Sequence, residues 1–279
     1  MTTFLESLDL TESSAGTFQC RSVQLEGRPV FGGQLLAQAI MAAAQLEPDR
    51  SVRSLSVVFP RTGDPRRPID VTTAALHRGR TLSSLRATFT QGDRVVCEAT
   101  IVTDTDGEAD VMRYADAMAH VSGPHDATPA PLLSEQGAEV RVVGGADIFS
   151  SHADGPAELL TWVRWPHLTA VDRATHSAVA LWYTDALLIA ASMRPVEGLD
   201  ISMAHEFVST GVLTHTVSFH APIDASQWHL VENRVAFAGG GRIYGTGSIY
   251  TESGDRVMSF AQDSMVRQIK QTSGAGPVM

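Results

Sequence analysis

The chain has 279 residues, of which 43% are hydrophobic and 19% are charged, and its formal net charge is -10. This composition fits a globular protein of one large domain or two smaller ones, and the negative charge argues against a nucleic-acid binder, which normally carries a basic face. The two cysteines, Cys20 and Cys97, lie far apart and outside any CxxC pattern. We therefore expect neither a metal site nor a disulfide framework.

The amino-terminal segment MTTFLESLDL lacks a basic stretch followed by an apolar core, so it does not resemble a signal peptide. No apolar run in the chain reaches the length of a membrane span. These features predict a cytoplasmic protein without a membrane span.

The first long element is a predicted helix over residues 32–45, GGQLLAQAIMAAAQ. It is apolar around most of its circumference, which is typical of a helix surrounded by other structure. Alternating apolar residues then predict strands within 54–64, 69–79, 81–91 and 92–102, and the Gly-Asp pair that opens the last of these segments indicates a hairpin turn.

The second half of the chain repeats this order. A stretch rich in Asp, Pro, Gly and His spans 104–139, and a second apolar helix is predicted over 176–193. Strand-like segments follow, and GDRVMSFAQDSMV at 254–266 echoes GDRVVCEATIV at 92–102. The repeat predicts an α+β duplication in which each half has one buried helix and a run of antiparallel strands.

This repeat divides the chain into four predicted parts. We expect an N-terminal domain over 1–110, a linker over 111–140, a C-terminal domain over 141–270 and a disordered tail over 271–279.

Four motifs resemble those of the acyl-CoA thioesterase II family. VFGGQLLAQAIMAA at 30–43 is similar to the family's VFGGQ…GQAL, FPRTGD at 59–64 to its F-x-R-x-G-D, VSFH at 217–220 to its MWFH, and AQDSMVR at 261–267 to its VQEGVMR. They occur in the family's order and at compatible spacing across 30–267. The resemblance implies a double hotdog, with two long central helices each wrapped by a curved antiparallel β-sheet.

The resemblance also implies an activity, the hydrolysis of fatty acyl-CoA to free acid and CoA. It implies acyl-CoA as the partner molecule and neither a metal nor a redox cofactor. Because hotdog proteins bury sheet edges and helix faces by pairing, we expect a homo-oligomer, a dimer or tetramer of double-hotdog chains.

The family assigns catalysis to an Asp in the second central helix, a hydroxyl residue on the next strand and a Gln on the last strand. By resemblance these roles imply Asp185 and Gln262. The chain departs from the pattern at the hydroxyl, where Val212 stands. Thr214 is the expected substitute, because positions two apart in a strand point to the same face.

The residues around Asp185 carry an argument of their own. In WYTDALLIA the carboxylate stands among apolar side chains, and partial burial would raise its pKa toward the working pH of a general base. The alternative is a solvated carboxylate on a helix edge. Gln262 offers an amide that could hold a water or bond to Asp185, or it could face solvent on its strand.

Five residues are candidates for binding the substrate. Gly32 and Gly33 open the first helix, whose unpaired N–H groups suit an oxyanion or a phosphate, although small residues can also serve packing alone. Gln34 takes the place in the first copy that the catalytic Asp takes in the second. Arg78 and Arg80 could bind the CoA phosphates, or could be surface residues.

Two other functions stay open. The loss of the hydroxyl at Val212 allows a non-catalytic or degenerate acyl-CoA binder. An enoyl-CoA hydratase of the hotdog type would need an Asp and a His facing one pocket, and Asp147 with His152 is the weak candidate pair.

Overall fold

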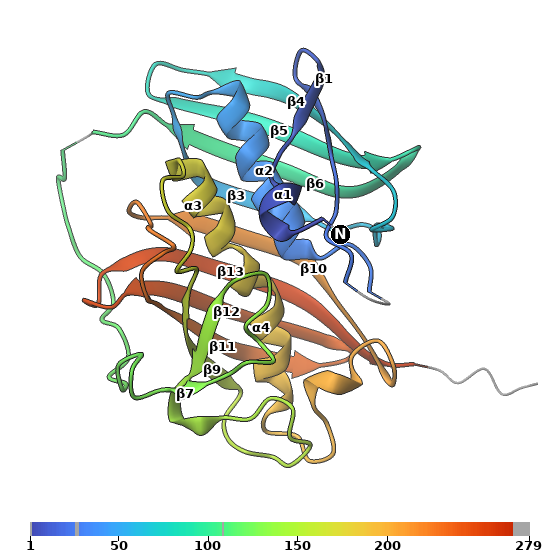
Figure 1. The fold of residues 1–279 in the computed structure, drawn as a ribbon, viewed down its shortest axis with the longest axis vertical. Helices are drawn as coiled ribbons and strands as arrows, with labels where there is room; N and C mark the ends of the chain where they lie inside the picture. Colours follow the sequence, from blue (N-terminus) through green and yellow to red (C-terminus); the bar gives the residue numbers. More distant parts are fainter. Residues whose placement is uncertain (1, 26–27, 108, 270–279) are drawn as a thin grey trace, which may run out of the picture.

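The computed structural model of the protein describes residues 2–25, 28–107 and 109–269. The described strands form one thirteen-stranded sheet in the order β1-β2-β4-β5-β6-β3-β10-β13-β12-β11-β9-β8-β7, and neighbouring strands in it are antiparallel (Figure 1). The strands of the first half are β1 Thr11–Ser14, β2 Thr17–Cys20, β3 Ser51–Val58, β4 Ile69–Arg78, β5 Leu82–Gln91 and β6 Arg94–Asp104. Those of the second half are β7 Thr128–Pro129, β8 Glu139–Val142, β9 Glu158–Arg164, β10 Val208–Phe219, β11 His229–Gly239, β12 Arg242–Thr251 and β13 Arg256–Gln268.

The two halves join through β3 and β10. Leu55 pairs with Val217 and Val58 with Thr214, and the guanidinium of Arg53 donates a hydrogen bond to the carbonyl of Phe219 at 3.1 Å. We expected a separate sheet around each central helix. The structure instead has one continuous sheet, because the first strand after each helix pairs with its counterpart in the other half.

The principal helices lie on one face of this sheet (Figure 1). They are α2 Gly32–Leu46, α3 Arg173–Ala180 and α4 Trp182–Met193, and shorter turns occur at α1 Phe4–Ser7, Val143–Gly145 and Ile201–Met203. α2 contacts β3, β5 and β6, whereas α4 contacts β9 through β13. None of the described helices is long and apolar enough to cross a membrane.

The helix expected over 176–193 is two helices in the structure. α3 begins after Asp172, whose carboxylate caps it by accepting the N–H of Thr175 at 2.7 Å. At Leu181 the chain tightens, because both the N–H and the hydroxyl of Thr184 bond to the Leu181 carbonyl, at 3.2 and 2.8 Å. Such a tight turn, with a side chain competing for a backbone carbonyl, separates α3 from α4.

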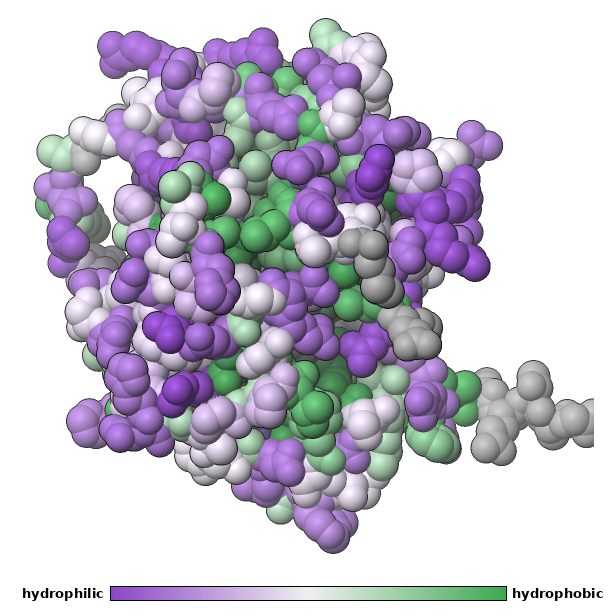
Figure 2. Space-filling model, viewed as in Figure 1, coloured by the Kyte–Doolittle hydropathy of each residue, from purple (hydrophilic) through white to green (hydrophobic). Residues whose placement is uncertain are grey.

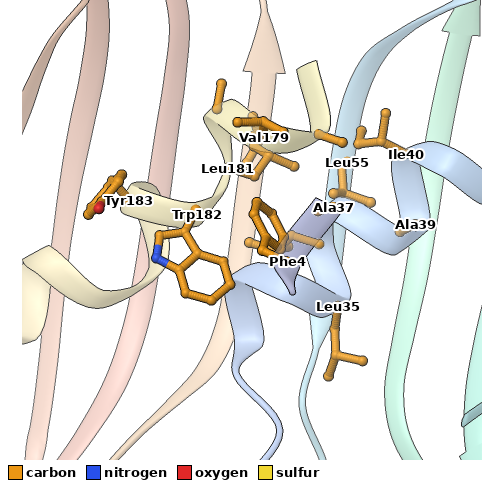
Figure 3. Packing of buried hydrophobic residues seen from close by; sticks show 14 of the residues in the cluster. Phe4, Leu35, Ala37, Ala39, Ile40, Leu55, Val179, Leu181, Trp182 and Tyr183 are labelled. Atoms are coloured by element: carbon orange, nitrogen blue, oxygen red, sulfur yellow. The ribbon is translucent and has the colours of Figure 1, made fainter. Parts of the chain in front are cut away.

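The core fills the layer between helices and sheet. Alanines on α2, including Ala37 and Ala39, are fully buried and let α3 and α4 approach closely. Figure 3 shows Phe4 lying between Trp182 and α2, and the two aromatic ring centroids are 4.4 Å apart. On the face that carries the helices, apolar residues gather in the middle and hydrophilic ones cover the periphery (Figure 2).

The segment expected to be a linker crosses the other face of the second half. The indole of Trp162 donates to the Ser122 carbonyl at 2.9 Å, and the N–H of Ala119 donates to the carboxylate of Glu232 at 3.1 Å. We call residues 118–127 of this segment the strap. Trp162 and Tyr250 form a small apolar cluster beneath it. The predicted domain boundaries themselves stay predictions, and the predicted tail lies outside the described residues.

A glycine on β12 gives a test of this packing. A Cβ on Gly247 would lie 2.1 Å from the Phe260 ring and 2.3 Å from the Glu232 carbonyl, whereas one on Gly211 of β10 would meet open space. Gly247→Ala should lower the free energy of unfolding by about 1–3 kcal/mol, the usual cost of overpacking. Thermal melts of both variants check this, and equal melting temperatures for Gly247→Ala and Gly211→Ala would contradict it.

Candidate active site

Asp185 lies in the first turn of α4, where the beginnings of α2 and α4 meet. Its side chain is 4% exposed. A Cβ on Gly32 would lie only 2.8 and 2.9 Å from the two carboxylate oxygens, and a Cβ on Gly33 would lie 3.0 Å from the Trp182 carbonyl. Two successive glycines therefore allow the carboxylate to reach the start of α2.

The start of α2 has no cap of its own. The N-cap residue is Phe31, whose side chain cannot accept a hydrogen bond and packs instead on Trp182, with ring centroids 4.5 Å apart. Unpaired N–H groups and the positive end of the helix dipole thus face Asp185. This arrangement is an interhelical cap, and it also holds a carboxylate next to backbone donors.

Burial raises the pKa of Asp185 to about 7, and the nearby backbone N–H of Gly33 acts in the opposite direction. Its Oδ1 has no hydrogen-bond partner among the described residues. A carboxylate with a pKa near neutrality and an unpaired oxygen can both take up and release a proton at the working pH, which is the requirement for a general base.

Gln262 lies on the sheet face that α4 covers. It is 1% exposed, its Nε2 donates to the hydroxyl of Ser264 at 2.8 Å, and its Oε1 is unpaired within the described part of the chain. The methyl groups of Leu188 on α4 pack directly on Gly245, the cross-strand partner of Gln262. Because Asp185 stands one helical turn before Leu188, it projects into the same layer.

His215 was not among the predicted site residues. It is the cross-strand partner of Gln262, it is fully buried, and its ring stacks on Phe260 with centroids 5.7 Å apart. Neither ring nitrogen has a partner among the residues described. Burial lowers the pKa of His215 to about 3, so the imidazole is neutral. The alternation of THTVSF places His215, Val217 and Phe219 on one face, and that signal could have identified it.

The structure does not bring Thr214 to this site. Val212 pairs with Ser264 and Thr214 pairs with Asp263, so a β-bulge at Leu213 shifts the register between them. The bulge places positions 212 and 214 on opposite faces, contrary to the alternation that we assumed. The Thr214 side chain is exposed on the outer face, while Val212 faces inward opposite Ser264.

Gln34 and the two arginines occupy different places. Gln34 is fully buried, and its Oε1 accepts the N–H of Val23 at 2.8 Å. Arg78 lies 3.8 Å from Glu47 just beyond the last turn of α2, and the carbonyl of Arg80 accepts a hydrogen bond from Arg50 in the same region. The length of α2, roughly 20 Å, therefore separates the arginines from Gly32.

Asp147 and His152 do not form a pair on the helix-covered face. His152 is exposed and its Nδ1 lies 2.9 Å from Glu197, beyond the end of α4. The Asp147 carboxylate accepts the N–H of Phe149 at 3.0 Å. The geometry that a hydratase would need is not present between these two residues. Within the described ranges, no cluster of three or more His, Cys, Asp or Glu side chains could hold a metal ion.

An apolar pocket lies on the other side of α4. Tyr183 and Ala180 line it from the helices, and Val163, Val231 and Ile249 from the sheet. Asp185 does not line it, because residues two apart on a helix point in nearly opposite directions.

Two family models match the chain. Residues 22–103 match the acyl-CoA thioesterase N-terminal domain and residues 115–266 match the acyl-CoA thioesterase C-terminal domain. The chain belongs to the acyl-CoA thioesterase family. The two matches follow one another along the chain.

Individual proteins that are similar to this chain in sequence are also named acyl-CoA thioesterases. The chain is 27% identical over 269 residues to acyl-CoA thioesterase 2 of Haemophilus influenzae, covering 90% of this chain and 92% of that protein. It is 24% identical over 293 residues to human acyl-coenzyme A thioesterase 8, covering 95% of this chain and 89% of that protein.

Solved structures agree in fold. Acyl-CoA thioesterase II TesB2 of Mycobacterium marinum superposes with a TM-score of 0.80 at 22% identity, covering 96% of this chain and 99% of that one. A protein of unknown function with a hotdog fold from Alicyclobacillus acidocaldarius has a TM-score of 0.74 at 21% identity, covering 99% and 98%. The fold of this thioesterase family member is therefore a hotdog fold.

The raised pKa of Asp185 predicts that the free energy of unfolding depends on pH. Because the folded protein holds this proton more tightly than the unfolded chain, the stabilisation is complete below about pH 4 and is lost as the pH rises through about 7. In Asp185→Asn the side chain cannot ionise, so this variant should not lose that stabilisation as the pH rises. Its melting temperature should exceed that of the wild type at pH 8, by the equivalent of up to about 4 kcal/mol, and the gap should shrink toward pH 4. A difference in melting temperature that does not change with pH would contradict the raised pKa of Asp185.

Proposed function

We propose that this chain hydrolyses acyl-CoA thioesters to free acid and CoA, with Asp185 as the general base. The observation that carries the proposal is the buried Asp185 carboxylate, with a pKa near 7 and an unpaired oxygen, set against the uncapped start of α2. Burial of a carboxylate without full hydrogen bonding costs free energy, so a purely structural role is a poor explanation for it.

The proposed reaction proceeds in two steps. Asp185 takes a proton from a water molecule while the water oxygen attacks the thioester carbonyl carbon, giving a tetrahedral oxyanion. The intermediate then expels the CoA sulfur, which receives the proton that Asp185 holds. The products are the carboxylic acid and the CoA thiol, and the carboxylate of Asp185 is regenerated.

The start of α2 is the proposed oxyanion site. The backbone N–H of Gln34 belongs to the first turn of α2, where donors have no partner within the helix. A preorganised donor of this kind is worth ~3 kcal/mol to the transition state. Gln262 and neutral His215, each with unpaired polar atoms in the described structure, are proposed to orient the attacking water.

The finer expectations about assembly and location are also proposals. The outer face of the sheet at β3 and β10 leaves Val58 half exposed, and the strap covers only the second half. This open face supports a homo-oligomer, a dimer or tetramer, and we retain the proposal that the protein acts in the cytoplasm.

Substitution of Asp185 tests the proposed function. With a panel of acyl-CoAs of increasing chain length, release of CoA thiol by the wild type should have a kcat/KM that rises with pH through about 7 and then levels off, because the ionised carboxylate is the active form. Asp185→Asn should lower kcat by about 10²–10⁴-fold and lose this pH dependence.

Two results would contradict this account. Equal activity of Asp185→Asn and wild type would remove Asp185 from catalysis. Binding of acyl-CoA by the wild type without hydrolysis at any chain length would favour the non-catalytic binder.

Substitution of Gly32 is a second, independent test of the contact between Asp185 and the start of α2. In Gly32→Ala the new methyl group would collide with both carboxylate oxygens of Asp185 and displace them from the start of α2. We expect kcat/KM to fall by about 10²-fold, the cost typical of a 1 Å misplacement. Gly123→Ala, where a methyl group meets open space, is the control. Full activity in folded Gly32→Ala would show that the close approach is not required.

A further inference from the structure

A buried hydroxyl lies beside the proposed site, on the last strand rather than on β10. Ser264 has no exposed surface and stands two residues after Gln262, so both side chains face α4. The Gln262 Nε2 donates to the Ser264 Oγ at 2.8 Å. A fully buried serine whose hydroxyl accepts a bond from a glutamine of the site is a polar element that the core does not need for packing.

His215 is the cross-strand partner of Gln262. The Gln262 side chain acts to raise the pKa of His215 against the larger effect of burial, and neither ring nitrogen has a hydrogen-bond partner among the described residues. Gln262 therefore has two polar neighbours, the Ser264 hydroxyl on its own strand and the neutral His215 imidazole on the adjacent strand. A serine hydroxyl can accept from the amide NH2 or donate to the amide oxygen, and in the structure it accepts from Nε2, which leaves Oε1 without a partner among the described residues.

The facing position on β10 has no hydroxyl. Val212 is the cross-strand partner of Ser264, and both side chains point inward because the β-bulge follows at Leu213. Thr214, beyond the bulge, faces outward and is exposed. Of these two strands, β13 therefore carries the hydroxyl that bonds to Gln262, that of Ser264.

We propose that Ser264 is a positioning residue for Gln262, which fixes the glutamine amide in the orientation used in thioester hydrolysis. The inference rests on the proposed function and extends it to Ser264, a residue that the resemblance gave no role. In this arrangement Ser264 provides, from the neighbouring strand, the hydroxyl that was expected at position 212. The amide carbonyl of Gln262 is then held ready to accept a hydrogen bond from the attacking water.

Removal of the hydroxyl is the first part of the test. Ser264→Ala should lower kcat for acyl-CoA hydrolysis by about 10- to 100-fold, as loss of a buried hydrogen bond does, because the amide can rotate away. KM should change by less than about threefold, because ground-state binding is untouched. The matched control is Ser259→Ala on the same strand, whose hydroxyl points to the opposite face and bonds to His220 at 2.7 Å. That variant should keep wild-type kcat.

Return of the hydroxyl from the opposite strand is the second part. Cross-strand partners have Cβ atoms about 4.5–5.5 Å apart, and threonine has the shape of valine. Val212→Thr in the Ser264→Ala background should therefore recover at least about fivefold in kcat, which a defect in packing alone would not do. Wild-type kcat in Ser264→Ala, or no recovery in the double variant, would overturn the proposal.

The two proposals fail in different ways. An inactive Asp185→Asn together with a fully active Ser264→Ala removes only the positioning role of Ser264. A fully active Asp185→Asn, or a wild type that hydrolyses no acyl-CoA, removes the proposed function itself.

Discussion

The contact between the Asp185 carboxylate and the start of α2 is the interaction on which the rest of the site depends. It requires Gly32, because a side chain there would occupy the space of the carboxylate oxygens. It also requires the two helix beginnings to meet, and the contact between the tilted rings of Phe31 and Trp182 holds them together. Burial favours the protonated acid, whereas the backbone N–H of Gly33 favours the anion, and the larger effect of burial leaves the pKa near neutrality.

The sheet imposes the second constraint. Because β10 and β13 are antiparallel neighbours, His215 and Gln262 must project from the same face toward α4. The bulge at Leu213 then decides which residues beyond it face the helices. One extra residue in a strand reverses the face of every side chain that follows, so the bulge turns Thr214 outward and leaves Val212 opposite Ser264.

Much of this arrangement could be predicted from the sequence, and the remainder has physical reasons. The apolar run around Asp185 indicated burial, and the repeat indicated two helices with antiparallel strands. The break at Leu181 depends on one side-chain hydrogen bond from Thr184, which helical periodicity does not contain. The bulge and the β3–β10 pairing depend on contacts between distant segments. For Arg78, no local pattern shows that α2 lies between it and the site.

A direct titration of Asp185 tests the central claim. Carboxyl carbon chemical shifts of protein labelled with ¹³C at aspartate can be followed from pH 4 to pH 9, with Asp185→Asn identifying the resonance. The account predicts a pKa near 7 for this carboxyl, about three units above an ordinary aspartate. A pKa at or below the ordinary value would mean that Asp185 serves as a permanently charged cap of α2, and would contradict its role as the base.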